Sequence, residues 1–348
     1  MSSRAACWKT VPTEPREPKP EWRDVPPPLR EKLSALAGEA IAGADIAWGG
    51  YGPSATFVLT TASGRRLFCK GTHPGQTELG HRALIREREN YMRFPELAGF
   101  GPAYLGGADH ENWHMAMLDY APRRCTVPPW TQDTLMLAIR LVARFHAETP
   151  ARAAAAVRPL NDLMAEQMRQ GWRSLLGDAA ARGRFLALFE DARGAAHWLS
   201  QHGERLAALE ASATGVGGPR SWLHMDIRSD NLIFADRLLL VDWPNLTYGA
   251  TLIDVAGFVP SVEGEGGPRC ADMLLRYEQA AGMRFDAEDV TAAAAFVAGF
   301  FAARAGEPEI SALPRLRGVQ KRQLVPALTW LCGCLAIDAP SMPHPAGA

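Results

Sequence analysis

The sequence lacks the main features of disulfide-stabilised, membrane-spanning and nucleic-acid-binding proteins. Only six of its 348 residues are cysteine, and they are scattered without the spacing of a disulfide framework. The longest apolar run, at residues 291–303, is shorter than the ~20 residues that a transmembrane helix needs. Lysine and arginine (37) balance aspartate and glutamate (38), so the chain has none of the excess basic charge typical of nucleic-acid binding. We expect a globular protein whose partners include neither membrane nor nucleic acid.

The start of the chain is rich in proline and charge and has no apolar core of a signal peptide. Because repeated proline disfavours both helix and sheet, we expect residues 1–27 to form a disordered or loosely attached tail. Residues 339–348, which are also rich in proline, should form a second tail. The composition is that of an ordinary globular protein, and we expect it to be cytoplasmic.

The first third of the chain between these tails has the pattern of a small sheet. Residues 41–71 read as strand, glycine-rich turn, strand, tight turn and strand, and the turn GGYG occupies residues 49–52. A charged segment at residues 81–97 places Glu87 on the same helical face as several apolar side chains. Two further strands follow up to about residue 120. This part should be a sheet with one helix.

From about residue 130 the pattern is mostly helical, with one short β-like interruption. The interruption contains Asp226 and Asn231, then two short apolar runs, then Asp242. The two runs predict a hairpin that places Asn231 and Asp242 close together at one end. Asp226 would then lie in one cluster with an amide and a second carboxylate.

Phosphoryl transfer requires such a cluster. Magnesium prefers carboxylate and amide oxygens together with phosphate oxygens, and a separate carboxylate must orient and deprotonate the attacking hydroxyl. A lysine must hold phosphate charge, and Lys70 lies at the end of the third predicted strand. Glu87, on the following helix, could aim that lysine. Glu89 is a rival for this role.

The segment HMDIRSDN, at residues 224–231, with Asp242 eleven residues later, resembles the HxDxxxxN motif and metal-binding Asp of the aminoglycoside phosphotransferase family. These are small-molecule kinases. The GGYG turn, Lys70 and Glu87 occur upstream in the matching order, and ARFHAE at residues 143–148 is similar to another segment of the family. The resemblance extends over most of residues 41–338.

This resemblance implies an α+β, bilobal, protein-kinase-like fold. Residues 28–121 would form a nucleotide-binding lobe with a small antiparallel sheet and one helix. Residues 122–338 would form a larger, mostly helical lobe with the catalytic loop and the acceptor site. The donor would be a magnesium complex of ATP or GTP, and the acceptor a hydroxyl of a small molecule.

The resemblance also implies the role of each site residue. Asp226 would be the catalytic base, His224 a structural member of the catalytic loop, and Arg228 a cation within reach of the γ-phosphate. Asn231 and Asp242 would bind Mg²⁺. The proposed nucleotide contacts are Lys70 with Glu87, the turn glycines Gly49, Gly50 and Gly52, and the interlobe hinge of Asp119, Tyr120 and Ala121. Asp254 would brace the catalytic loop.

Two other functions fit the sequence less well. A protein kinase needs a long peptide-docking segment after its metal-binding Asp, and only twelve residues separate Asp242 from Asp254. A regulatory pseudokinase, the main alternative, would be expected to have lost a base or a metal ligand. The acceptor stays open between an aminoglycoside, to which Glu263 and Glu265 could contribute negative charge, and another antibiotic or metabolic alcohol. ATP against GTP and the oligomeric state also stay open.

Overall fold

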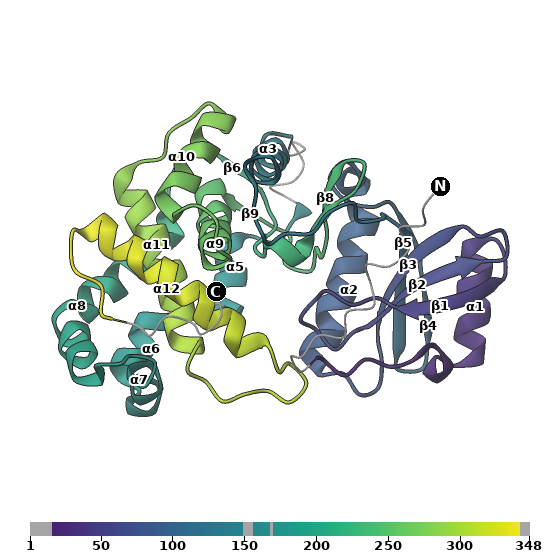
Figure 1. The fold of residues 1–348 in the computed structure, drawn as a ribbon, viewed down its shortest axis with the longest axis horizontal. Coiled ribbons are helices and arrows are strands. Elements are labelled where there is room, and N and C mark those ends of the chain that lie inside the picture. Colours follow the sequence, from purple (N-terminus) through teal and green to yellow (C-terminus); the bar gives the residue numbers. More distant parts are fainter. Residues whose placement is uncertain (1–15, 149–155, 168–169, 342–348) are drawn as a thin grey trace.

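The computed structural model describes residues 16–148, 156–167 and 170–341. It has two lobes (Figure 1): a five-stranded antiparallel sheet with two helices, and a larger part that is mostly helical. The predicted α+β, bilobal architecture is confirmed.

The sheet of the small lobe has the strand order β1-β2-β3-β5-β4. Its strands are β1 (Ile41–Ile46), β2 (Ala55–Thr61), β3 (Arg66–Thr72), β4 (Tyr104–His110) and β5 (Trp113–Asp119). Side chains alternate between the two faces of a strand, and one face buries Phe57, Leu59 and Leu67 against α1 (Pro27–Ala37). The other face carries Lys70 and is approached by α2 (Glu78–Arg93) (Figure 1).

The predicted N-terminal tail is wrong for its last residues. Residues 16–26 pack on the protein, and the side chains of Glu17 and Val25 are 1% and 0% exposed. Pro27, the last residue of the predicted tail, starts α1 together with Pro28, at positions where the missing N–H groups would have no helical partner. The rest of the predicted tail, residues 1–15, and most of the second, residues 342–348, lie outside the described residues.

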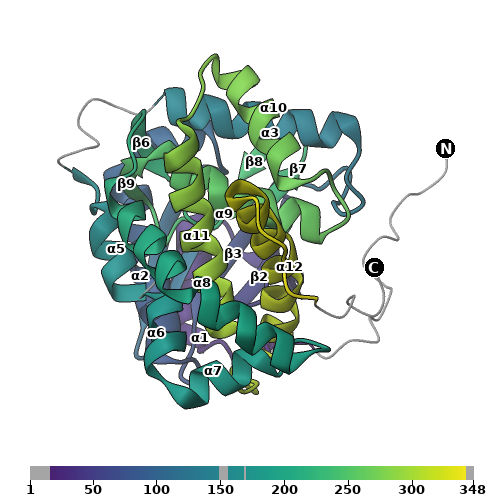
Figure 2. The same ribbon diagram turned by 90° about the vertical axis from the view of Figure 1, so that its left-hand side faces the viewer.

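The large lobe is built around α11, as Figure 2 shows. Its helices are α3 (Gln132–Ala147), α5 (Leu160–Gln167), α6 (Gly171–Gly177), α7 (Ala179–Leu186), α8 (Ala192–Ser212), α9 (Thr251–Gly264), α10 (Cys270–Ala281), α11 (Ala287–Arg304) and α12 (Leu316–Leu335). The middle of α11, residues 292–299, is buried all round, as expected of a helix that is apolar on every side. None of the helices in the described part of the chain is both long and apolar enough to cross a bilayer.

Two short strand pairs form the predicted β interruption. β7 (Leu232–Phe234) and β8 (Leu238–Leu240) are the expected hairpin. β6 (Arg220–Leu223) pairs instead with β9 (Thr247–Ala250), which the sequence did not predict. Four residues that include a glycine carry too little periodicity to mark a strand.

Candidate active site

The loop between β6 and β7 brings Asp226 and Asn231 together. The Asn231 side-chain amide donates hydrogen bonds to the Asp226 carbonyl at 2.8 Å and to its carboxylate at 3.3 Å. Asn231 is only 4% exposed, so its position is fixed. Both bonds use the amide nitrogen, so neither involves the amide oxygen of Asn231.

The β7–β8 hairpin adds Asp242 to this pair. The Val241 N–H donates to the Asn231 carbonyl at 3.0 Å, which holds the end of the hairpin against the loop. From the small lobe, Lys70 reaches across to the Asp242 carboxylate and also contacts Glu87 at 2.8 Å. Glu87 is 3% exposed, whereas Glu89 is exposed on the surface of α2. Glu87 is therefore the partner of the lysine.

These contacts determine the charge of the cluster. Burial alone would lower the pKa of Lys70, but the Asp242 and Glu87 carboxylates raise it above its ordinary value. Burial likewise opposes ionisation of Asp242, and the charge of Lys70 overcomes this and lowers the pKa of that carboxyl. The cluster thus holds a charged lysine and a charged carboxylate at neutral pH.

Arg228 lies beside Asp226 and is held by Asp230. Its guanidinium lies 3.3 Å from the Asp226 carboxylate and donates two bonds of 3.1 Å to Asp230. Burial opposes its charge, but these carboxylates raise the pKa of Arg228 overall. The ring of Tyr51, from the glycine-rich turn, lies 5.3 Å from this guanidinium. The turn therefore extends over the loop between β6 and β7.

Asp254 stabilises the loop between β6 and β7 through hydrogen bonds to its backbone. Its carboxylate accepts hydrogen bonds from the backbone N–H groups of His224 at 2.8 Å and Met225 at 2.7 Å, and it contacts His146 at 3.1 Å. Met225 has a φ of 64°, a conformation that costs energy for a residue other than glycine. The His224 ring lies 2.9 Å from the Val241 carbonyl. His224 and Asp254 hence support the loop, and neither reaches into the cluster.

The predicted hinge residues lie where the chain leaves the small lobe. Asp119 ends β5 and contacts Arg65 at 3.0 Å, while Arg66 lies 4.1 Å from the centre of the Tyr120 ring. Ala121 follows, and by Arg124 the backbone is bonded to β7 of the large lobe. The three residues connect the lobes, and their backbone begins at the end of β5, an interior strand of the sheet.

The predicted glycines lie in the turn between β1 and β2. Gly49 has a φ of 144°, which side-chain-bearing residues rarely adopt. The Gly50 carbonyl accepts a bond of 2.9 Å from Arg315, which precedes α12 in the other lobe. Tyr51 and Gly50 thus join the turn to the large lobe, whereas Gly52 has no such contact with any residue that the structure describes.

Three charged residues near the turn were missed from the sequence. Glu17 accepts two hydrogen bonds from Arg315, at 3.0 and 2.5 Å. Lys19 donates to the Ser54 carbonyl at 3.0 Å and to the Thr56 hydroxyl at 2.9 Å. Figure 1 shows this purple segment running from the junction of the lobes to α1. No local signal marks these residues, because they lie in a proline-rich stretch or between helices.

Lys19 lies close to Lys70. Thr56, which binds the Lys19 ammonium, pairs directly with Lys70 in the sheet, so both side chains are on the same face. Burial and, next, the charge of Lys70 lower the pKa of Lys19 to about 8. Two cations therefore lie under the glycine-rich turn.

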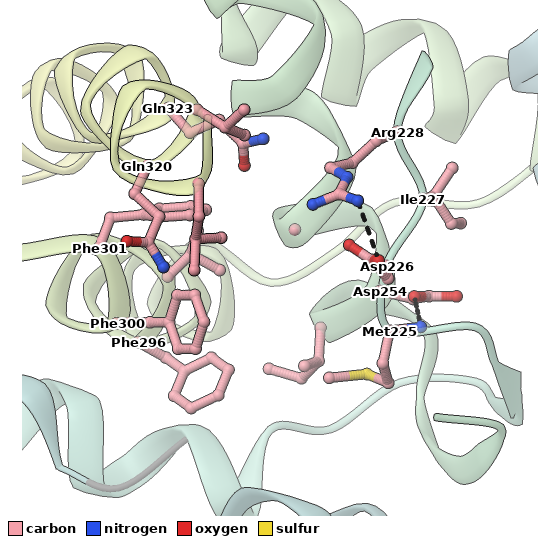
Figure 3. Close-up of a pocket in the computed structure, with 15 residues that line it drawn as sticks. Met225, Asp226, Ile227, Arg228, Asp254, Phe296, Phe300, Phe301, Gln320 and Gln323 are labelled. Atoms are coloured by element: carbon pink, nitrogen blue, oxygen red, sulfur yellow. Dashed lines mark hydrogen bonds and ion pairs between the residues drawn. The ribbon is translucent and has the colours of Figure 1, made fainter. Parts of the chain in front are cut away.

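A cavity of about 170 Å³ opens beside Asp226, between the β6–β7 loop and the helices α9, α11 and α12. Its walls are Met225, Asp226, Ile227, Arg228, Ile253, Asp254, Gly257, Phe296, Val297, Phe300, Phe301, Leu316, Val319, Gln320 and Gln323. In Figure 3, Phe296 and Phe300 face the loop across the cavity, and the two glutamines reach in from α12. The sequence did not indicate this site, because its wall is contributed by distant helices.

A model of the phosphotransferase enzyme family matches residues 46–290. A search of curated proteins found no match. Among solved structures, an aminoglycoside phosphotransferase from Alicyclobacillus acidocaldarius is similar, with a TM-score of 0.55 and 14% identity over 87% of this chain and 95% of its own. Spectinomycin phosphotransferase, solved with ADP and spectinomycin, has a TM-score of 0.54 and 14% identity, and the match covers 86% of this chain and 93% of its own. An aminoglycoside-3'-phosphotransferase of type VIII has a TM-score of 0.51 and 20% identity, and the match covers 78% of this chain and 98% of its own. At these identities the likeness concerns the fold.

Proposed function

Because the chain belongs to the phosphotransferase enzyme family, we propose that it transfers the γ-phosphoryl group of a magnesium-nucleotide, ATP or GTP, to a hydroxyl group of a small molecule. The main support is one connected set of contacts. Asn231 bonds to Asp226, the hairpin fixes Asp242 beside Asn231, and Lys70 crosses between the lobes to Asp242. This set contains a base, oxygen ligands for a metal and a cation for phosphate.

Each residue has one task in this proposal. Asp226 accepts the proton of the acceptor hydroxyl as its oxygen attacks the γ-phosphorus. Lys70, kept charged and aimed by Glu87, binds phosphate oxygens of the nucleotide. Arg228, beside Asp226, neutralises charge that develops on the transferred group. The backbone from Asp119 to Ala121 offers the nucleotide base its hydrogen-bonding groups.

The oxygen donors fit magnesium. Asp242 supplies a carboxylate and Asn231 an amide oxygen, and proteins commonly bind Mg²⁺ through one or two such groups together with nucleotide phosphates. The ion would neutralise phosphate charge. The Lys70–Asp242 contact keeps the carboxylate ionised, which a metal ligand requires.

Thermal stability with and without Mg²⁺ and ATP or GTP tests the nucleotide site. Ligand at a hundredfold excess over its Kd stabilises the folded state by about 2.7 kcal/mol, and we expect a magnesium-dependent rise in Tm for the wild type. Asp242→Ala should abolish the rise. Asp236→Ala is the matched control, because this carboxylate lies on the same hairpin but is 76% exposed and contacts Arg124.

Asp226→Asn tests the base separately. This variant should keep the magnesium-nucleotide shift, because Asp226 contacts the acceptor and not the nucleotide in the proposal. It should lose turnover with any acceptor that the wild type phosphorylates. Full turnover in Asp226→Asn would show that Asp226 is not the base, and the absence of a nucleotide shift in the wild type would favour a pseudokinase.

A further inference from the structure

The cavity beside Asp226 determines which acceptor the site can take, provided that the proposed phosphotransfer is correct. One side of the cavity is Asp226, so a molecule bound there presents its hydroxyl to the base. Opposite it in Figure 3 lie Phe296 and Phe300 of α11 with the two glutamines of α12, and Val297 and Leu316 add further apolar surface to the wall. A cavity of roughly 150 Å³ with such walls is large enough for a benzene ring, and this one has about 170 Å³.

The cavity offers little to a polycation. Its two carboxylates are Asp226, which faces Arg228, and Asp254, whose oxygens accept the N–H groups of the catalytic loop. Glu263 accepts a bond of 2.7 Å from the Cys270 N–H and is not part of the wall. An amine in the cavity would lose its hydration without gaining a free carboxylate in return.

Both carboxylate oxygens of Glu265 already accept hydrogen bonds from other side chains. It accepts bonds from the Trp130 indole at 2.9 Å and from the Ser229 hydroxyl at 2.5 Å. The acidic pair considered from the sequence as a source of charge for an aminoglycoside therefore stabilises local structure. Arg317, behind the Gln320 wall, donates to the side-chain amide oxygen of Gln320 at 2.8 Å and pairs with Glu307 at 2.9 Å.

Gln323 offers a polar group to a ligand in the cavity. Gln323 is 7% exposed, reaches into the cavity from α12 (Figure 3), and its amide has no hydrogen-bond partner within the described ranges. A neutral ligand with a hydroxyl, ether or carbonyl group at this end could form a hydrogen bond with this amide.

We propose that the acceptor is an uncharged alcohol with an aromatic or alicyclic ring, and not a polycationic sugar. The ring lies between the phenylalanines of α11 and the catalytic loop, and a second neutral polar group binds Gln323. The acceptor oxygen forms a bond to the γ-phosphorus while the bond from that phosphorus to the β–γ bridging oxygen breaks. The proton passes to Asp226, and the products are a phosphate monoester and a nucleoside diphosphate.

The test compares three probes by calorimetry and saturation-transfer NMR on the full chain: 4-(2-hydroxyethyl)phenol, 2-phenylethanol and kanamycin. The first two differ only by the phenolic hydroxyl, which is the group expected at Gln323. The wild type should bind 4-(2-hydroxyethyl)phenol about three- to tenfold more tightly than 2-phenylethanol, the usual range for one hydrogen bond. Kanamycin should bind more weakly than either.

Gln323→Leu should abolish the preference for the phenolic probe while keeping 2-phenylethanol binding. Lys321→Ala, on the exposed face of the same helix, is the matched control and should behave as the wild type. Phe300→Ala should weaken both aryl alcohols. The proposal is overturned if kanamycin binds more tightly than the aryl alcohols, or if the preference survives Gln323→Leu.

Binding of Mg-ADP, measured on the same samples, separates the two proposals. Mg-ADP binding without aryl-alcohol binding would refute the acceptor class and leave phosphotransfer standing. Aryl-alcohol binding without Mg-ADP binding would support the ligand class of the cavity and refute phosphotransfer.

Discussion

Lys19 should make nucleotide binding depend on pH. Its ammonium lies under the glycine-rich turn on the same face as Lys70, and burial together with that neighbour lowers its pKa to about 8. Phosphate bound between the two lysines would favour the charged form and raise the pKa of Lys19 again. Nucleotide binding should therefore take up a proton from solution around pH 8.

The size of the effect follows from the pKa of Lys19. In the free protein Lys19 is about half protonated at pH 8, so binding there should take up about half a proton. If the bound form stays protonated, affinity should fall about tenfold between pH 7 and pH 9, or about 1.4 kcal/mol. Lys70 adds nothing over this range, because its pKa is raised.

Calorimetry of Mg-ADP binding at pH 8, in two buffers with different enthalpies of ionisation, measures this proton uptake. Lys19→Arg keeps a cation that does not titrate, so it should bind Mg-ADP with no uptake and with a flat pH profile. Lys19→Met should bind more weakly at pH 7 and should also lose the pH dependence. Proton uptake of the same size in Lys19→Arg would refute the reasoning, because another group would then be its source.

Three further substitutions test how the large lobe is held together. In Asp254→Asn one oxygen that accepts a loop N–H becomes a donor. The substitution should therefore lower the free energy of unfolding by about 1–3 kcal/mol, and it should reduce kcat while the affinity for Mg-ADP is kept. Denaturant unfolding measures the first effect and steady-state kinetics the second. Gly171→Ala should destabilise by about 1–3 kcal/mol, because a Cβ there would lie 1.9 Å from the Gly299 carbonyl. In the same unfolding assay Gly183→Ala, an exposed helical position with open space around it, should instead stabilise by about 0.5–1 kcal/mol.

Much of the cluster could be predicted from the sequence, because its members are close together along the chain or follow regular patterns. Asp226 and Asn231 belong to one loop, and the two short apolar runs predicted the hairpin that brings Asp242 to them. Helical periodicity put Glu87 on the inward face of α2, and the structure shows its contact with Lys70. Period and spacing are local properties, so they can be read without a structure.

Only the tertiary structure brought distant segments together. Lys19 lies in a proline-rich stretch that predicted a loose tail, and it is fixed by hydrogen bonds to residues more than thirty positions away. The cavity beside Asp226 arises where α9, α11 and α12 meet the catalytic loop. Its apolar residues look from the sequence like ordinary core, because hydrophobic periodicity reports that a side chain is buried but not whether protein or ligand covers it. The sequence by itself therefore determined the fold and the chemistry of the cluster, while the packing of the helices decided what lies next to it.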